Sequence, residues 1–240
     1  MFRKLAVICI LTFPMVSVAQ EATEAGEPDP WSGKATLGYL ATSGNTENTS
    51  INTGFEIGYT RNKWFHQLTA KAVNSSQQEE TTAEAYQAGW KTEYSFSESA
   101  FAFGRADWRK DRFSGYARQL SATVGAGYRF IDTENHTLNA ELGAGARQQD
   151  TQDGIEENDT VIRGGLNYVW RLSETAQFNQ DLAIETGETN TYIESVSAIK
   201  ATLIGDLALV ASYTIKNNSD VPVGLENTDT FTALSLEYGW

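Results

Sequence analysis

The sequence predicts an all-β fold: a transmembrane, antiparallel, up-and-down β-barrel of about 12 strands, with short periplasmic turns and longer extracellular loops. Apolar and polar residues alternate almost without pause from Trp31 to Trp240, and connections of alternating length separate the alternating segments. These segments are about twice as long as the five to six residues that are typical of strands in soluble proteins. A tilted strand needs that length to cross a membrane.

The N-terminal residues predict export. Arg3 and Lys4 precede a short apolar run, and small residues stand at the −3 and −1 positions of a cleavage point after Ala19. The run is too short for a membrane anchor and contains Pro14. We therefore predict a signal peptide at 1–19, a flexible acidic segment at 20–30 and an outer-membrane β-barrel at 31–240.

The composition excludes several classes of function. Cys9 lies in the predicted signal peptide, so the exported chain would have no thiol for disulfides, catalysis or metal binding. The formal net charge of −13 becomes −15 when Arg3 and Lys4 leave, and phosphate binding needs a cationic surface, so nucleic acid is not an expected partner. No later stretch approaches the ~18 apolar residues of a transmembrane helix.

The alternating segments define the predicted strands. Their approximate spans are 31–42, 49–61, 64–75, 83–96, 100–112, 118–131, 137–148, 160–172, 176–187, 192–204, 207–217 and 229–240. Short turns are predicted at 61–63, 97–99, 132–135, 173–175 and 205–206, and longer loops at 43–48, 74–82, 113–117, 149–159, 188–191 and 218–228. This alternation of connections is typical of outer-membrane barrels, and an even strand number puts both termini on the periplasmic side.

The alternation separates charged from apolar side chains. One face carries no formal charge across the predicted strands. The other carries Lys34, Glu56, Lys71, Lys91, Glu93, Arg105, Asp107, Arg109, Asp111, Arg129, Glu141, Arg147, Arg163, Arg171, Asp181, Glu185 and Glu237. A charge on the lipid face at mid-bilayer costs about 2–4 kcal/mol, so the apolar face is predicted to contact lipid. In 192–204, where both phases hold apolar residues, we place Ile193, Ile199 and Leu203 outward because Glu194 and Lys200 then point inward.

A soluble sandwich or lipocalin-like barrel is the alternative, because its strands also alternate. Two features favour the membrane barrel. The charged face is rich in glycine, which weakens a strand and suits a crowded lumen better than a face in bulk water. Aromatic residues gather beside the short turns, as they do at membrane interfaces; they are Tyr59, Trp64, Tyr94, Phe96, Tyr128, Phe130, Trp170, Tyr238 and Trp240.

Several stretches resemble the salt-induced outer-membrane protein family, whose function is uncharacterised. They are "LGYLATSGNTENTS" at 37–50, "YTRNKWFHQL" at 59–68, "FGRADWRKDRFSGY" at 103–116, "VGAGYRF" at 124–130, "NNSDVP" at 217–222 and "NTDT" at 227–230. The resemblance implies an outer-membrane barrel and supplies no catalytic residues. Trp240, with apolar residues at alternate positions before it, resembles the sorting signal of outer-membrane proteins, which implies delivery by the barrel-assembly machinery.

The charged residues predicted to face the lumen are the candidate functional residues. Arg105, Asp107, Arg109 and Asp111 recur at every second position in "RADWRKD"; Arg129, Arg147 and Arg163 share their face. They could form a constriction that orders ions or a small polar solute. The alternative is a salt-bridge network that fills the lumen, because buried charges must be paired. Twelve strands enclose a narrow lumen, which is compatible with either arrangement.

Two further motifs are weaker. His66 and His136 stand beside short turns, where a general base could not reach outer-leaflet lipid or external peptide, so we interpret them as interfacial polar residues and do not predict an enzyme. The acidic stretch "DTQDGIEEND" at 150–159 is predicted to be a solvated loop. It could instead bind divalent cations that bridge to lipopolysaccharide, but its spacing matches no known calcium loop.

These observations predict a narrow channel for ions or small polar solutes in the cell outer membrane. The resemblance adds a possible link to salt or osmotic stress. The expected partners are outer-membrane lipids and lipopolysaccharide, the barrel-assembly machinery and an unidentified small solute, with no cofactor, metal or nucleic acid. Two other functions stay open: a plugged barrel that maintains envelope integrity without transport, and an outer-membrane enzyme.

Overall fold

The computed structural model describes residues 29–42, 48–77, 80–112, 116–152, 154–221, 224 and 226–240. The predicted signal peptide at 1–19 and residues 20–28 of the predicted acidic segment lie outside the described residues. Within the described residues all regular secondary structure is β-strand. No helix there is long and apolar enough to span a membrane.

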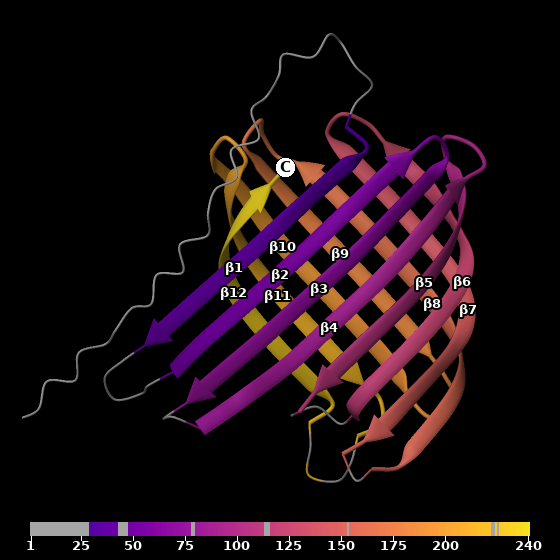
Figure 1. Cartoon of the computed structure of the whole chain (residues 1–240), viewed down its shortest axis with the longest axis vertical. Helices are drawn as coiled ribbons and strands as arrows, with labels where there is room; N and C mark the ends of the chain where they lie inside the picture. Colours follow the sequence, from indigo (N-terminus) through magenta and orange to yellow (C-terminus); the bar gives the residue numbers. More distant parts are fainter. Residues whose placement is uncertain are drawn as a thin grey trace, which may run out of the picture.

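The described strands form one closed antiparallel barrel, which confirms the predicted fold class. They are β1 (Trp31–Thr42), β2 (Asn48–Arg61), β3 (Trp64–Gln77), β4 (Glu80–Ser95), β5 (Ala100–Asp111), β6 (Tyr116–Asp132), β7 (His136–Thr151), β8 (Glu156–Arg171), β9 (Ala176–Thr186), β10 (Thr191–Ile204), β11 (Leu207–Asn218) and β12 (Thr228–Gly239). Each strand pairs with its sequence neighbours, and β12 closes against β1. β1 therefore begins at the end of the barrel where β12 finishes, beside the C-terminus (Figure 1).

The two ends of the barrel differ in their connections. One end, which we call the short-turn end, carries the tight turns after β2, β4, β6, β8 and β10. Two of these turns contain left-handed backbone, at Asn62 with φ 56° and at Gly205 with φ 53°, and asparagine and glycine adopt this conformation at low cost. The opposite end, the long-loop end, carries the remaining connections.

The strands continue further towards the long-loop end than the sequence predicted. The segments 74–82 and 149–159 were expected to be loops, but β3 runs to Gln77, β4 starts at Glu80, β7 runs to Thr151 and β8 starts at Glu156. Pairing continues in the extension, from Gln148↔Asn158 to Asp150↔Glu156. The loop prediction was wrong there because both faces of the extension are polar, so the alternation in the sequence stops before the strands do.

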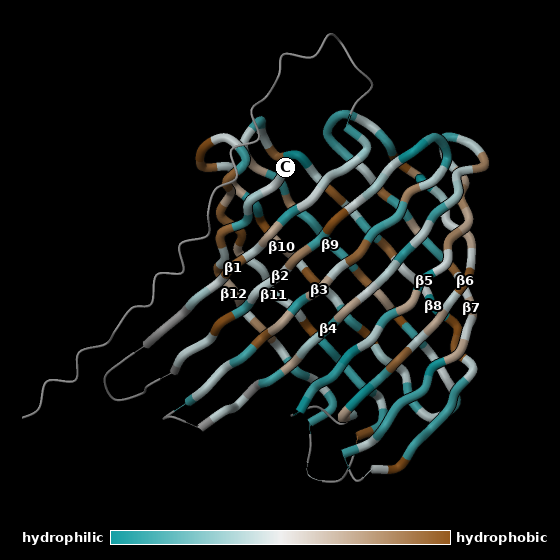
Figure 2. The backbone as a smooth tube through the Cα atoms, in the orientation of Figure 1, coloured by the Kyte–Doolittle hydropathy of each residue, from teal (hydrophilic) through white to brown (hydrophobic). Residues whose placement is uncertain are grey.

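The outer surface is apolar over the middle of the strands. Val124, Leu142 and Ile162 are 68%, 67% and 61% exposed, and hydrophobic and hydrophilic residues alternate along the strands in Figure 2. The ambiguous strand β10 follows the predicted phase, with Ile199 and Leu203 exposed on the outside. A soluble barrel would bury these side chains in its core, so the arrangement suits a surrounding lipid phase.

Aromatic residues form a belt around the short-turn end. Its ring pairs are Trp31–Tyr59, Trp64–Tyr94, Tyr94–Phe96, Tyr128–Phe130 and Tyr238–Trp240, with centroids 4.6 to 6.4 Å apart. His66 stacks on Trp64 at 5.8 Å, and His136 stacks on Trp170 at 5.8 Å. Both histidines therefore belong to the belt, where an apolar ring face and a polar edge are both accommodated.

Two phenylalanines fill part of the lumen near this end. Phe101 and Phe103 on β5 are 2% and 4% exposed. They lie over inward-facing glycines: a Cβ added to Gly127 would stand 2.2 Å from Cζ of Phe101, and one on Gly125 would stand 2.8 Å from Cε1 of Phe103. The sequence predicted a crowded, glycine-rich lumen but did not identify these rings, although they share the phase of Arg105.

Candidate lumen site

The structure places all the candidate charges inside the barrel, mostly on the side formed by β5–β9. Their first ion pair lies within one strand. Arg105 binds Asp107 through two hydrogen bonds, Nε to Oδ2 at 2.5 Å and Nη2 to Oδ1 at 2.7 Å. Side chains two residues apart on a strand share a face, so the predicted ladder of alternating sign is partly neutralised internally.

Arg109 does not continue this pattern. Its guanidinium lies over the ring of Tyr192, with Cζ 4.3 Å from the centroid, and its Nη1 is 3.5 Å from Oε2 of Glu185. Stacking on an aromatic face suits the planar, weakly hydrated guanidinium group. Arg109 therefore ties β5 to β9 and β10 across the lumen.

Glu185 on β9 is the centre of a buried cluster. Its side chain is fully buried. Its Oε1 accepts hydrogen bonds from Nη1 of Arg163 at 2.7 Å and from Oγ of Ser121 at 3.2 Å. A carboxylate without water needs such partners, because its desolvation is expensive. The cluster consequently fixes β6, β8 and β9 relative to one another.

Arg147 forms a second buried cluster nearer the long-loop end. Its Nη2 donates to Oδ2 of Asp159 at 3.1 Å and to the carbonyl oxygen of Asn190 at 2.6 Å. Asp159 also accepts a hydrogen bond from Oγ1 of Thr189 at 2.6 Å. The prediction that this stretch is a solvated acidic loop is wrong for Asp159, because the extended β8 turns its carboxylate into the lumen.

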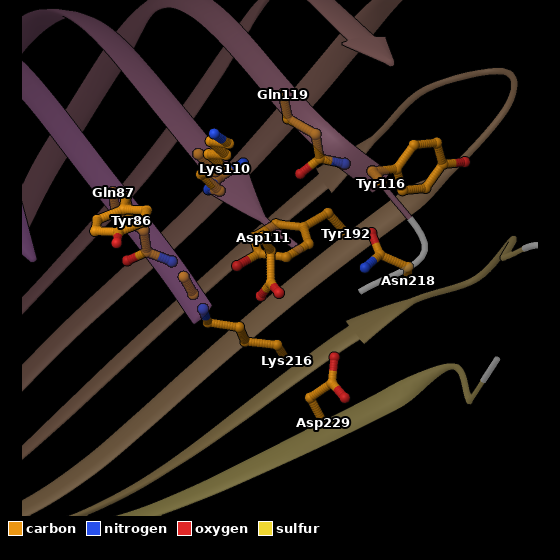
Figure 3. Close-up of a pocket in the computed structure, with 12 residues that line it drawn as sticks. Tyr86, Gln87, Lys110, Asp111, Tyr116, Gln119, Tyr192, Lys216, Asn218 and Asp229 are labelled. Atoms are coloured by element: carbon orange, nitrogen blue, oxygen red, sulfur yellow. The ribbon is translucent and has the colours of Figure 1, made fainter. Parts of the chain in front are cut away.

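Arg129 belongs to a third cluster, near the short-turn end. Its Nη2 is 3.4 Å from Oε2 of Glu93, and its Cζ is 4.7 Å from the ring centroid of Phe101. Lys91 pairs with both Glu93, at 2.8 Å, and Glu141. Charges of both signs are thus paired along the whole β5–β9 side, and the last candidate, Asp111, lies at its long-loop end beside Lys216 and Asp229 (Figure 3).

The free space begins along β1, β2 and β10–β12, borders β1–β10 in the middle of the lumen, and continues along β1–β4 and β10–β12. A mouth cavity of about 450 Å³ at the short-turn end is lined by Lys34, Glu56, Lys200 and Glu237 among others. It is followed by a polar cavity of about 440 Å³. The charges lining the polar cavity are Lys34, Lys71, Lys91, Arg105, Arg129 and Arg163 opposite Glu56, Glu93, Glu141, Asp181 and Glu194.

Towards the long-loop end the free space narrows. An apolar cavity of about 200 Å³ comes first, and its lining includes Val73, Val196, Val210 and Phe231. An outer cavity of only about 20 Å³ follows, lined by Tyr86, Gln87, Arg109, Lys110, Asp111, Tyr116, Gln119, Tyr192, Lys216, Asn218 and Asp229 among others (Figure 3). The roles of Tyr192 and Lys216 could not be predicted from the sequence, because their neighbours across the lumen come from strands far away in sequence.

A closed barrel with an apolar outer surface and a charged lumen defines a porin-like fold of the outer-membrane type. Two solved structures resemble it in fold: the NanC porin, with a TM-score of 0.51 and 12% identity over 86% of this chain and 97% of that one, and the KdgM porin, with a TM-score of 0.46 and 7% identity over 87% and 98%.

The chain belongs to the family described as "Protein of unknown function, DUF481", which matches residues 35–240. It is also similar to "Uncharacterized protein YdiY" of Escherichia coli, with 30% identity over 215 residues that cover 89% of this chain and 85% of the relative. Membership of a family without an assigned function agrees with the resemblance in the sequence, and the link to salt stays a prediction.

Proposed function

We propose that the protein is a narrow channel of the bacterial outer membrane for ions or small polar solutes. The observation that carries this proposal is the succession of cavities. The mouth and polar cavities share Lys34 and Glu56, the polar and apolar cavities share Lys71 and Glu194, and the apolar and outer cavities share Gln87 and Lys216 among their lining residues. The cavities therefore adjoin one another from the mouth to the outer cavity.

The outer cavity would limit what passes. Its volume of about 20 Å³ is close to the ~10–15 Å³ that one water molecule needs by the same kind of measure. Arg109 and Lys216 stand there beside Asp111 and Asp229, so a passing solute meets both signs of charge at close range. Such a constriction favours small solutes and depends on side-chain movement.

The proposed orientation puts the short-turn end in the periplasm. The aromatic belt there and the polar extensions of β3–β4 and β7–β8 at the other end support it, because outer-membrane barrels have short periplasmic turns and project outwards. In this setting outer-membrane lipids and lipopolysaccharide surround the barrel, the barrel-assembly machinery inserts it, and use under salt or osmotic stress is the role that the family resemblance suggests.

Conductance of the purified protein in planar lipid bilayers tests the proposal. We expect discrete steps for the wild-type chain. Arg109→Ala should raise the step size, because it widens the outer cavity, and should shift the reversal potential towards cation selectivity, because Glu185 and Asp111 remain. Arg118→Ala is the matched control: Arg118 pairs with Asp150 at 2.8 Å on the exposed outer surface and lines no described cavity. Absence of steps at several salts and voltages would contradict the channel.

A plugged barrel that supports the envelope is the second candidate, and one observation favours it. The β5–β9 side is filled by paired charges, and the outer cavity is almost closed. A plugged barrel predicts that wild-type protein gives no steps. We do not propose an enzyme, since His66 and His136 are engaged in the aromatic belt, and the similar solved structures reported above are porins.

A further inference from the structure

The junction between β1 and β12 is paired over only part of its length. Register partners run from Lys34↔Gly239 to Gly38↔Ser235, whereas β1 pairs with β2 along its full length to Thr42↔Asn48. In the described chain, the β1 backbone from Tyr39 to Thr42 and the β12 backbone from Thr228 to Leu234 have no partner across this junction. The strands lie together near the C-terminus and diverge towards the long-loop end (Figure 1).

The unpaired part begins within the membrane and, at Thr42, reaches the outer edge of the apolar band, about 26 Å from the belt. Tyr39 stands eight residues beyond Trp31 of the aromatic belt, which at ~3.3 Å per residue and a tilt near 45° places it roughly 19 Å from the belt. The apolar band of an outer-membrane barrel is about 25 Å tall. Backbone groups without partners are costly in hydrocarbon, so a gap at this depth is unexpected in a purely structural barrel.

The end of the paired part is fastened by side chains. Oγ of Ser235 on β12 donates to Oδ1 of Asn52 on β2 at 3.2 Å, directly across Gly38 of β1. A Cβ on Gly38 would lie 1.7 Å from that Oδ1, so only glycine admits this bond. The bond sits at the last register pair, Gly38↔Ser235, and separates the closed half of the junction from the unpaired half.

The apolar cavity lies directly behind this junction. Phe231, Ala233 and Ser235 of β12 line it together with Thr36 of β1. Its wall is otherwise rich in aliphatic and small side chains, among them Val73, Ala85, Val196 and Val210. An apolar cavity of about 150 Å³ is large enough to hold benzene, so one of about 200 Å³ accepts a larger apolar group.

Two cations at this cavity lack an ion-pair partner. Within the described residues neither Lys71 nor Lys216 forms a salt bridge, although most other lumen cations do, and Lys216 instead lies 5.2 Å from the ring centroid of Phe231. Both line the apolar cavity, as does one carboxylate, Glu194. Among the residues that line this cavity, two ammonium groups stand against one carboxylate, and Asp111 and Asp229 lie beside Lys216 only in the adjoining outer cavity. An apolar wall with such a lining is complementary to a hydrocarbon chain that ends in an anionic group.

We propose that the apolar cavity binds a single-chain anionic amphiphile of the fatty-acid class, which reaches it from the membrane through the unpaired half of the β1–β12 junction. Its chain lies against Val73, Val210 and Phe231, and its carboxylate meets the ammonium groups of Lys71 and Lys216. The inference requires that the barrel is embedded in a membrane, but it does not require ion conduction.

Binding of decanoate to the full chain in liposomes tests the site. In the double variant Lys71→Met/Lys216→Met, we expect affinity to fall about ten-fold or more, because each carboxylate–ammonium contact is charge-assisted. Arg118→Met is the matched control and should bind as the wild type does, because Arg118 pairs with Asp150 at 2.8 Å on the exposed outer surface, away from the apolar cavity. Decyltrimethylammonium, with the same chain length and opposite charge, should bind weakly. Equal affinity of the double variant and the wild type would overturn the proposal.

A cross-link across the junction tests the route. Two double-cysteine variants in a Cys9→Ala background are compared. The first, Tyr39→Cys/Leu234→Cys, places its cysteines where the register of β1 and β12 would continue. The second, Leu37→Cys/Leu236→Cys, places them at an existing register pair. Linking the first pair with a short bifunctional maleimide should slow decanoate binding about ten-fold or more, while linking the second should change nothing. Unchanged binding after the first linkage would show access from the lumen and overturn the lateral route. A barrel that binds decanoate without conducting would contradict only the channel.

Discussion

At the residue scale, the buried pair between Arg147 and Asp159 shows how the lumen tolerates charge. Both side chains are almost completely buried, at 0% and 2% exposure. They hold each other at 3.1 Å, and Arg147 also bonds the backbone of Asn190. Removing one member of such a pair leaves an uncompensated charge, whereas removing both is far less damaging.

We therefore predict that Arg147→Met lowers the free energy of unfolding by about 3–5 kcal/mol. Arg147→Met/Asp159→Leu should recover most of that loss, because no buried charge is left without a partner. Denaturant unfolding of the refolded barrel in lipid vesicles measures the free energy of unfolding of the single and the double variant. Arg118→Ala, which breaks an exposed pair, should stay within about 1 kcal/mol of the wild type. A double variant as unstable as the single one would contradict this interpretation.

At the element scale, the closing strand β12 is held to its neighbours by contacts on the outside of the barrel as well as by the Ser235–Asn52 hydrogen bond on the inside. Trp240 and Gly33 exchange backbone hydrogen bonds of 3.0 Å. The indole ring of Trp240 lies over Gly33, where a Cβ would stand 2.2 Å from Cζ2, and its centroid is 6.0 Å from that of Phe55 on β2. The ring thus spans β1 and connects β12 to β2.

Gly33→Val should displace this ring. We expect a loss of about 1–3 kcal/mol, the usual cost of forcing extra volume into a packed contact, and a smaller folded fraction after insertion into liposomes. The altered electrophoretic mobility of the folded barrel before heating reports that fraction. Gly54→Ala is the matched control, since a Cβ there meets Thr36 at an ordinary 3.5 Å. Equal folded fractions for Gly33→Val and Gly54→Ala would exclude a role for the Trp240 contact.

The sequence predicts the elements better than their contacts. Period-two alternation located the strands and resolved β10, because lipid admits no charge such as Glu194 or Lys200. It failed at the ends of β7 and β8, where both faces carry polar residues, so that apolar and polar residues do not alternate in the sequence. It also could not show that Arg109 stacks on Tyr192 rather than pairing with Asp111, because that contact depends on the register and curvature of strands far apart in sequence.

At the scale of the whole molecule, the lumen is unevenly filled. Paired charges and phenylalanine rings crowd the side formed by β5–β9, but the polar cavity borders that side as well, and the apolar cavity is confined to β1–β4 and β10–β12. Because of this asymmetry, the lumen of a 12-stranded barrel can be filled in one part and free in another. The paired charges fix the shape, while the cavities offer both a polar path and an apolar space beside the junction.

The central claim is that lipid surrounds this barrel and water enters it, and a nitroxide scan along β11 tests it most directly. Single labels in liposome-embedded protein would occupy Leu209, Ala211 and Tyr213, which face outwards, and Val210, Ser212 and Thr214, which line the apolar cavity. We predict that dissolved oxygen speeds the spin relaxation of the labels in the first set and that the labels in the second set couple to the deuterons of heavy water. Contact with lipid and contact with water should therefore alternate from one residue to the next. Equal contact of Ala211 and Ser212 with heavy water, or no alternation at all, would contradict the account.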